Sequence, residues 1–245
     1  MNLFKIPLNL TYQEVLPFLG MNKEPAPQEK ELIEHFLIKI KQLAQPIGAW
    51  ETFAVKTRES ERICLEASPL QLVGVSTCEH FKTCEHITLI AATLGAEIDQ
   101  LLSRLNSENP AHALVADAVA STSIEFFTEQ LDLYLSAQIR HKGYFPTARF
   151  SPGYGEWPLN WQKEFLSSVK SEKIGLTTTA YFHLEPSKSV TAALGWSRIP
   201  VKRDYDSPPA TMANPTKKFC KPCRSDQTCR YCQLASSCPD HLGQN

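Results

Sequence analysis

One segment in the second half of the chain carries residue types that suit ligand binding. It reads Arg149-Phe150-Ser151-Pro152-Gly153-Tyr154-Gly155-Glu156-Trp157-Pro158. Each proline fixes its own φ angle and biases the preceding residue toward extended geometry, while each glycine permits positive φ or a close approach of backbone. The segment is therefore predicted to form a shaped loop rather than a helix or a strand.

The chemistry of this loop suits an adenosyl ligand that carries a carboxylate. Arg149 can donate two parallel hydrogen bonds to a carboxylate, exposed peptide groups can read an adenine edge, and the ring of Tyr154 can cover a ribose or a base. We expect Arg149, Ser151, Gly153 and Tyr154 to contact such a ligand. Composition alone leaves a structural proline-rich turn as the alternative, since a protein has few ligand sites.

Five of the eight cysteines lie close together at the C-terminal end, in the order Cys220-x2-Cys223-x5-Cys229-x2-Cys232-x5-Cys238. Two Cys-x-x-Cys pairs joined by a short spacer can converge on one metal, and the surrounding lysines and arginines favour the thiolate that binds it. We expect Cys220, Cys223, Cys229 and Cys232 to hold an iron–sulfur cluster or zinc. Free or disulfide-forming thiols are a third alternative, and Cys238 has no assigned role.

The short pattern Cys-Glu-His occurs twice, beginning at Cys78 and at Cys84. The two copies could form a second metal site. On a helix, however, residues six positions apart are separated by about 600° of rotation and do not share a face. We therefore favour a single helix that carries a semi-buried cysteine.

The elements that must position these groups alternate irregularly between helices and strands. Apolar spacing and capping residues predict helices at 11–19, 28–45, 96–105, 110–136 and 159–169. The helix opened by Asn109 and Pro110 is the longest, at roughly 40 Å. Strand patterns lie at 51–55 and 63–65 (a hairpin), 86–91 (a buried strand or a helix start), 176–184 and 189–196.

This order of elements favours an α+β fold. The 245 residues allow one large domain with a small appendage. We predict a single domain over residues 1–197, with a twisted antiparallel sheet and long helices. Residues 198–216 are polar and interrupted by prolines, which is typical of a linker. Residues 217–245 form the cysteine-rich, metal-binding tail.

Composition limits the class of protein. A hydrophobic content of 42% is sufficient for a core, and a net charge of −1 gives no global field that would attract nucleic acid or an acidic membrane. The N-terminal residues lack the apolar run of a signal peptide, and no stretch has the length of a transmembrane helix. We expect a cytoplasmic protein without nucleic-acid or membrane partners, in a compartment that keeps thiols reduced.

The Arg149 segment, followed by Trp161-Gln162-Lys163, resembles the S-adenosylmethionine-binding activation domain of vitamin B12-dependent methionine synthase, and its free-standing family members most closely. Weaker similarities lie at 14–20, 92–95 and 186–192, where Pro186-Ser187-Lys188-Ser189-Val190-Thr191-Ala192 is similar to the family's Pro-x-Lys-Ser-Val-Ser-Ala. The resemblance covers residues from about 10 to 196.

The resemblance implies S-adenosylmethionine as the ligand, with a glutamate near its amino group. Glu125 matches that glutamate in context, because apolar residues flank it on the long predicted helix, and Glu129 is the fallback. Two positions depart from the larger relatives: their tyrosine near the end of the domain corresponds to about Leu194, and their Thr-Glu pair reads Thr179-Ala180.

The function that the resemblance implies is reductive reactivation of a cobalamin-dependent methyltransferase. Cobalamin would be bound to a partner, either methionine synthase or another corrinoid protein. An electron donor such as flavodoxin or ferredoxin would serve the reaction, and the cysteine tail could relay the electron. The alternative is a non-enzymatic S-adenosylmethionine-sensing or scaffold module whose tail is a structural zinc site.

Overall fold

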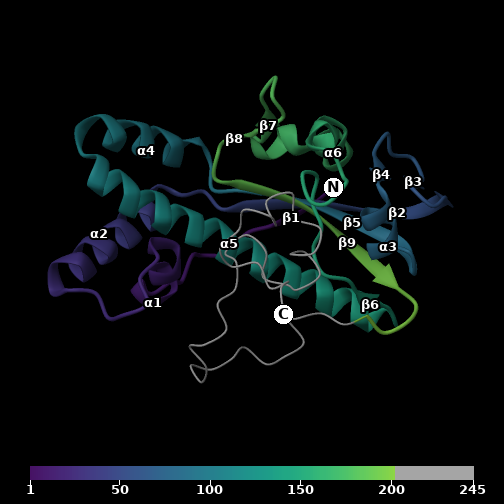
Figure 1. Cartoon of the computed structure of the whole chain (residues 1–245), viewed down its shortest axis with the longest axis horizontal. Helices are drawn as coiled ribbons and strands as arrows, with labels where there is room; N and C mark the ends of the chain where they lie inside the picture. The colour runs from purple at the N-terminus through teal and green to yellow at the C-terminus, as the bar shows by residue number, and fades with distance from the viewer. Residues whose placement is uncertain (202–245) are drawn as a thin grey trace, which may run out of the picture. The chain divides into compact units, whose positions relative to one another are not determined.

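The computed structural model describes residues 1–201, and it has the predicted α+β class with a curled antiparallel sheet and long helices (Figure 1). The main sheet has the strand order β4-β3-β2-β5-β9-β6, with β1 paired to β2. None of the helices in the described part is long and apolar enough to cross a membrane. The predicted metal ligands Cys220, Cys223, Cys229 and Cys232, and most of the predicted linker, lie outside the described residues.

The five predicted helices, the predicted hairpin and the strand predicted at 189–196 are all present, together with short elements that were not predicted. The helices are α1 (Tyr12–Val15), α2 (Pro27–Leu43), α3 (Val75–His80), α4 (Ala96–Glu108), α5 (Pro110–His141) and α6 (Gln162–Val169), with 3-10 turns η1 (Leu16–Leu19), η2 (Leu159–Trp161) and η3 (Ser171–Ile174). The strands are β1 (Asn2–Phe4), β2 (Ile47–Arg58), β3 (Arg62–Leu65), β4 (Gln71–Val73), β5 (Cys84–Thr93), β6 (Phe145–Pro146), β7 (Thr177–Thr178), β8 (Leu184–Glu185) and β9 (Ser189–Ser197).

The chain forms two compact units. Unit 1 consists of Met1–Glu51, Ile90–Tyr134 and Val169–Thr191, and unit 2 consists of Thr52–Leu89, Leu135–Ser168 and the described residues from Ala192 to Val201. Helix α5 and strands β2, β5 and β9 each contribute residues to both units.

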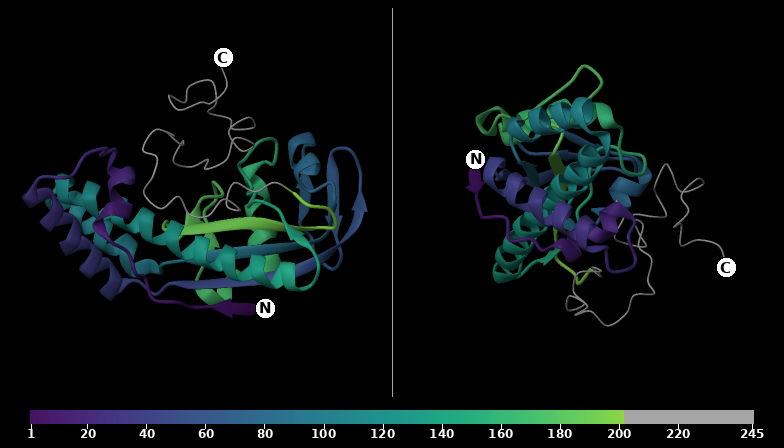
Figure 2. Two further views of the ribbon diagram at one scale, coloured as in Figure 1. Left: turned by 90° about the horizontal axis from the view of Figure 1, so that it is seen from below. Right: turned by 90° about the vertical axis from the view of Figure 1, so that its left-hand side faces the viewer.

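The core of unit 1 is built from the apolar stripes that the periodicity predicted. Helix α2 buries Ile33, Phe36 and Ile40, and these side chains belong to one cluster with residues of α4 and of the first half of α5. The ribbons of the three helices can be followed in Figure 2. In α2 these apolar residues recur every three or four positions, so one face of this helix is buried while its charged face meets solvent. This cluster fixes the N-terminal part of α5, which carries Glu125.

Two of the family-like segments, 92–95 and the part of 186–192 up to Thr191, lie side by side in unit 1. The Leu94 amide donates to the Lys188 carbonyl at 3.0 Å, and the Ser189 hydroxyl donates to the Thr93 hydroxyl at 2.8 Å. The Lys188 ammonium reaches α5, where it lies 2.7 Å from Asp117 and 3.0 Å from the Ser121 hydroxyl. These contacts join the start of β9 to the end of β5 and to α5, so both segments have a structural role in this unit.

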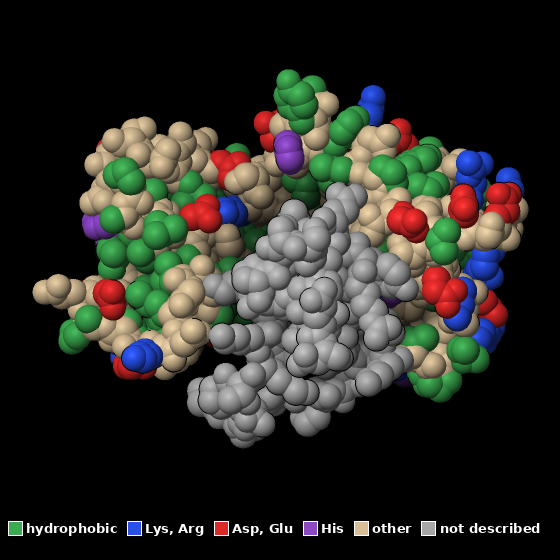
Figure 3. Space-filling view, in the orientation of Figure 1, with side chains coloured by type: hydrophobic (Ala, Val, Ile, Leu, Met, Phe, Trp, Pro, Cys, Tyr) green, Lys and Arg blue, Asp and Glu red, His purple; other side chains and the backbone are tan. Residues whose placement is uncertain are grey.

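Unit 2 is organised around short antiparallel pairs. Strands β2 and β3 form the predicted hairpin, β3 pairs with β4, and β6 pairs with β9. Phe81, Trp157 and Phe165 are its largest fully buried side chains. Acidic and basic side chains are interspersed over the β3 and β4 part of its surface (Figure 3), which gives that face no single-sign patch.

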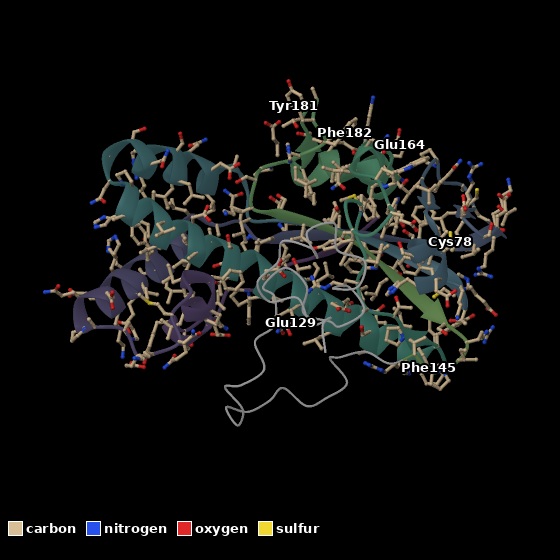
Figure 4. The ribbon with its side chains drawn as sticks, in the orientation of Figure 1. Cys78, Glu129, Phe145, Glu164, Tyr181 and Phe182 are labelled. Carbon is tan, nitrogen blue, oxygen red and sulfur yellow. The ribbon has the colours of Figure 1, made fainter. Side chains whose placement is uncertain are left out.

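The prediction of one strand over 176–184 is wrong. The segment folds back on itself as a separate two-stranded sheet in which Thr178 is opposite Leu184. The Thr179 amide donates to the His183 carbonyl at 2.8 Å, the Thr179 hydroxyl accepts from the amides of Tyr181 and His183 at 3.2 Å, and Phe182 has a φ of 66°. A residue whose backbone has this left-handed conformation interrupts a strand. Tyr181 and Phe182 lie at the tip of the hairpin (Figure 4), where Tyr181 is 80% exposed.

The prediction of one helix through both Cys-Glu-His copies is also wrong. The first copy ends α3 and the second begins β5, because the chain turns between them with the Cys84 amide donating to the Phe81 carbonyl at 3.0 Å. The Cys78 thiol donates to the Leu72 carbonyl at 3.8 Å (Figure 4 labels Cys78). Within residues 1–201, no group of three or more His, Cys, Asp or Glu side chains is arranged to hold a metal ion.

Cys84 lies in the interior of unit 2. It is fully buried and packs against Gly195, where any added Cβ would collide with its Sγ atom and lie 2.9 Å from both Phe81 and Thr147. Burial raises the pKa of Cys84 to about 12, although the Arg58 guanidinium lowers it in part. Burial also raises the pKa of Cys78. Both thiols therefore stay protonated at neutral pH, which makes them poor nucleophiles and poor metal ligands.

We predict that Cys84 resists alkylation in the folded protein. With a pKa of about 12, only about one molecule in 10,000 carries the thiolate at pH 8, so iodoacetamide should modify Cys84 about 1,000-fold more slowly than in denaturant. The rate should rise about tenfold for each pH unit between 8 and 10. Peptide mass spectrometry measures the rate, with the half-buried Cys64 as the internal comparison. Equal rates at the two sites would contradict the burial argument.

Candidate functional site

The Arg149 segment is a folded loop, as predicted. The Gly153 amide donates to the Trp157 carbonyl at 2.7 Å, the Tyr154 amide to the Ser151 carbonyl at 3.1 Å, and the Trp157 amide to the Tyr154 carbonyl at 3.0 Å. Gly153 has a φ of 95° and Gly155 a φ of 54°. The expectation of positive φ at Gly153 is therefore confirmed, and a side chain there would be strained.

The loop is anchored where the chain enters it. Phe150 forms an antiparallel bridge with Ala193 of β9, with amide-to-carbonyl distances of 3.0 and 2.7 Å in the two directions. The Nε2 atom of His80, at the end of α3, lies 2.9 Å from the Ala148 carbonyl, and its ring packs on Phe150 at 5.0 Å between centroids. Arg149 lies between these two attachments, so its backbone position is fixed from both sides.

The loop is anchored again where the chain leaves it. Trp157 is fully buried, and its indole N–H donates to the Gln71 carbonyl of β4 at 3.2 Å. Its ring stacks on Phe150 with an interplanar angle of 14° and lies 6.1 Å from the ring of Phe165 on α6. A buried tryptophan with a satisfied N–H contributes several kcal/mol through packing, roughly 3–5 on truncation to alanine.

A third attachment joins the loop to the start of α3. The Ser76 amide donates to the Glu156 carboxylate at 2.9 Å, and the Glu156 amide donates to the Ser76 hydroxyl at 3.2 Å. Gly74, with a φ of 99°, passes so close that an added Cβ would lie 2.5 Å from the Glu156 Cβ and 2.8 Å from its carbonyl oxygen. The roles of His80, Ser76 and Gly74 at the loop were not predicted from the sequence, because nothing local marks contacts that span 68 or 80 positions.

The predicted ligand-binding residues of the loop combine fixed backbone with access to solvent. Gly153 is exposed, while Arg149, Ser151 and Tyr154 are half-buried. The Tyr154 ring lies 6.2 Å from that of Phe150, and Arg149 and Ser151 each make interactions within the protein. The arrangement can present a guanidinium, a phenol and peptide groups without a large loss of loop entropy on binding.

Glu125 and Glu129 lie on α5 in unit 1, one helical turn apart. Both are half-buried and both interact with other residues (Figure 4 labels Glu129). The neighbouring hydroxyls of Ser123 and Thr128 donate to carbonyls four residues earlier in α5, at 2.8 Å each. Since Glu125 belongs to unit 1 and the loop to unit 2, the pairing of the two toward one ligand stays a prediction.

Comparison with known proteins gives one informative result. The chain is similar in fold to the solved structure "Crystal Structure of the MetH Reactivation Domain bound to AdoHcy", with a TM-score of 0.55 and 16% sequence identity over 80% of this chain and 72% of that one. The two share a fold. No protein-family model and no curated protein sequence matches the chain.

We predict that Gly74→Ala destabilises the protein more than Gly143→Ala. Both glycines have positive φ, 99° and 80°, which strains any other residue, and Gly74 also has a ψ of 146°, in a region that only glycine adopts readily. Only at Gly74 does the new methyl group also meet Glu156. That overlap should add roughly 1–3 kcal/mol. Thermal unfolding of the two variants measures the difference, and equal losses would show that the loop yields to the methyl group without cost.

Proposed function

We propose that this protein binds S-adenosylmethionine at the Arg149–Pro158 loop and supports reductive methylation of cob(II)alamin held by a partner, either a cobalamin-dependent methionine synthase or another corrinoid protein. The observation that carries the proposal is the loop itself. It is attached through Phe150, Glu156 and Trp157 in a chain whose fold is similar to that of a MetH reactivation domain.

The proposed role of each residue follows from the chemistry of the ligand. Arg149 would donate a forked pair of hydrogen bonds to the methionine carboxylate. The backbone of Gly153, which has a positive φ, would contact the adenosine together with Ser151. Tyr154 would cover the ribose or the base. Glu125 would accept from the ammonium group. All these contacts hold the ligand without any acid–base step, because the sulfonium already activates the methyl group.

The proposed reaction has two steps. Cob(II)alamin on the partner gains one electron from a donor such as flavodoxin or ferredoxin and becomes cob(I)alamin. The cobalt then attacks the sulfonium methyl group, the carbon–sulfur bond breaks, and methylcobalamin and S-adenosylhomocysteine result. In-line placement of the methyl group over cobalt is the main demand, so the protein acts by orientation.

The cysteine tail enters the proposal as an electron relay. Cys220, Cys223, Cys229 and Cys232 would hold an iron–sulfur cluster that passes the electron toward the corrinoid. A structural zinc site is the competing arrangement for the same thiolates. It would suit a module that binds S-adenosylmethionine and a partner without electron transfer.

Arg149→Ala should weaken S-adenosylmethionine binding about 10- to 150-fold, because a charge-assisted contact contributes ~1.5–3 kcal/mol. Calorimetry on the full chain measures the affinity. Arg62→Ala, an exposed arginine of β3 in the same unit, controls for the loss of one positive charge and should leave the affinity unchanged. An unaltered affinity in a folded Arg149→Ala protein would remove this residue from the site.

A chain that ends at Val201 should remain folded and bind S-adenosylmethionine with the full affinity, since the three loop attachments described above lie within residues 1–201. It should lose only the formation of methylcobalamin from cob(II)alamin on a partner with a low-potential reductant. The full chain purified without oxygen should show visible absorption that dithionite bleaches. A colourless full chain with stoichiometric zinc would refute the relay and favour the scaffold function.

A further inference from the structure

Unit 1 contains a cavity that the proposed function does not use. Its volume is about 730 Å³, and all of its lining residues belong to unit 1. Three segments form its walls: the chain that follows β1, the junction between α2 and β2, and the end of η3. A volume of this size lies in the range of small-molecule sites.

The floor of the cavity is aliphatic. Leu8 and Ile174 are buried, and Ile6, Ala44 and Ile47 are half-buried. The walls are held by backbone hydrogen bonds and strand pairing. Phe4 of β1 is paired with Gly48 of β2, which fixes the chain that follows, and the Leu176 amide donates to the Ser171 carbonyl at 3.1 Å, which closes η3.

The rim of the cavity is positively charged. Lys5, Lys41 and Lys173 all line it, and no aspartate or glutamate does. Among residues 1–201, none of these three ammonium groups forms an ion pair with a carboxylate, and Lys41 has a neutral partner, the Asn9 side-chain oxygen at 3.3 Å. Gln45 on the same rim donates to Glu97 at 3.4 Å. Three cations and no carboxylate line the cavity, so its potential is positive and favours an anionic ligand.

We infer that this cavity binds a small organic phosphate, with the phosphate at Lys5 and Lys173 and an aliphatic or aromatic body on the Leu8 and Ile174 floor. Lysine is a point-charge partner for phosphate. Lys41 lies in the last turn of α2, where its charge also complements the helix dipole, so its contribution to the ligand is the smallest of the three. S-adenosylmethionine carries a net positive charge, so the three lysines disfavour it in this cavity.

The test uses probes without adenine, so that they cannot occupy the proposed adenosyl site. Hexyl phosphate should bind the full chain at low salt at least about tenfold more tightly than inorganic phosphate, since the floor would bury about two methylene groups or more. Hexanol should not bind measurably, and added sodium chloride should weaken the binding of hexyl phosphate.

Charge variants locate the site. Lys5→Gln and Lys173→Gln should each weaken hexyl phosphate binding about two- to fivefold, and the double variant about tenfold. Lys23→Gln, an exposed lysine of unit 1 that does not line the cavity, should have no effect. All these variants should bind S-adenosylmethionine as the unaltered chain does, which separates this inference from the proposed function.

The inference is overturned by either of two results. One is hexyl phosphate binding no more tightly than inorganic phosphate. The other is Lys23→Gln weakening binding as much as Lys5→Gln and Lys173→Gln do, since that outcome would reflect a general attraction of anions to the basic surface.

Discussion

The burial of Trp157 is the interaction on which the candidate site depends. Its ring fills the interior of unit 2 beside Phe150 and Phe165, and its N–H is satisfied by the Gln71 carbonyl. Since an unsatisfied buried N–H would cost free energy, the tryptophan has one acceptable position. The residues between Phe150 and Trp157 must then close a short path between two fixed points, and the glycines with positive φ make that path possible.

Much of the fold could be predicted from the sequence, because the pattern of a long amphipathic helix is set by residues that are close together in the chain. The stripe of α2, the start of α5 at Pro110 and the helix end at Gly20 all follow from neighbours a few positions apart. Predictions failed where elements are short. Helix α3 is one and a half turns long, and periodicity cannot tell it from the strand that follows. The hairpin tip depends on one residue, Phe182, with positive φ.

The candidate site also has one part that could be predicted from the sequence and another that could not. The loop could be predicted because proline restricts the backbone and glycine permits positive φ wherever they occur. The residues that hold the loop in place could not be predicted, since His80, Ser76 and Gly74 contact it only once the chain has folded. The basic cavity of unit 1 was equally hidden, because Lys5, Lys41 and Lys173 come from three distant parts of the chain. The pairing of Glu125 with the loop rests on resemblance alone.

The contact between Gly195 and Cys84 has a consequence for the evolution of this chain. No side chain larger than hydrogen fits at Gly195, since an added Cβ would collide with Sγ of Cys84 and crowd Phe81 and Thr147. A homologue that has alanine or serine at this position must therefore have a smaller residue at the position of Cys84, or move the backbone of β9 away from β5. The residues at positions 84 and 195 should therefore covary across related sequences, because the spacing between β5 and β9 limits their combined size.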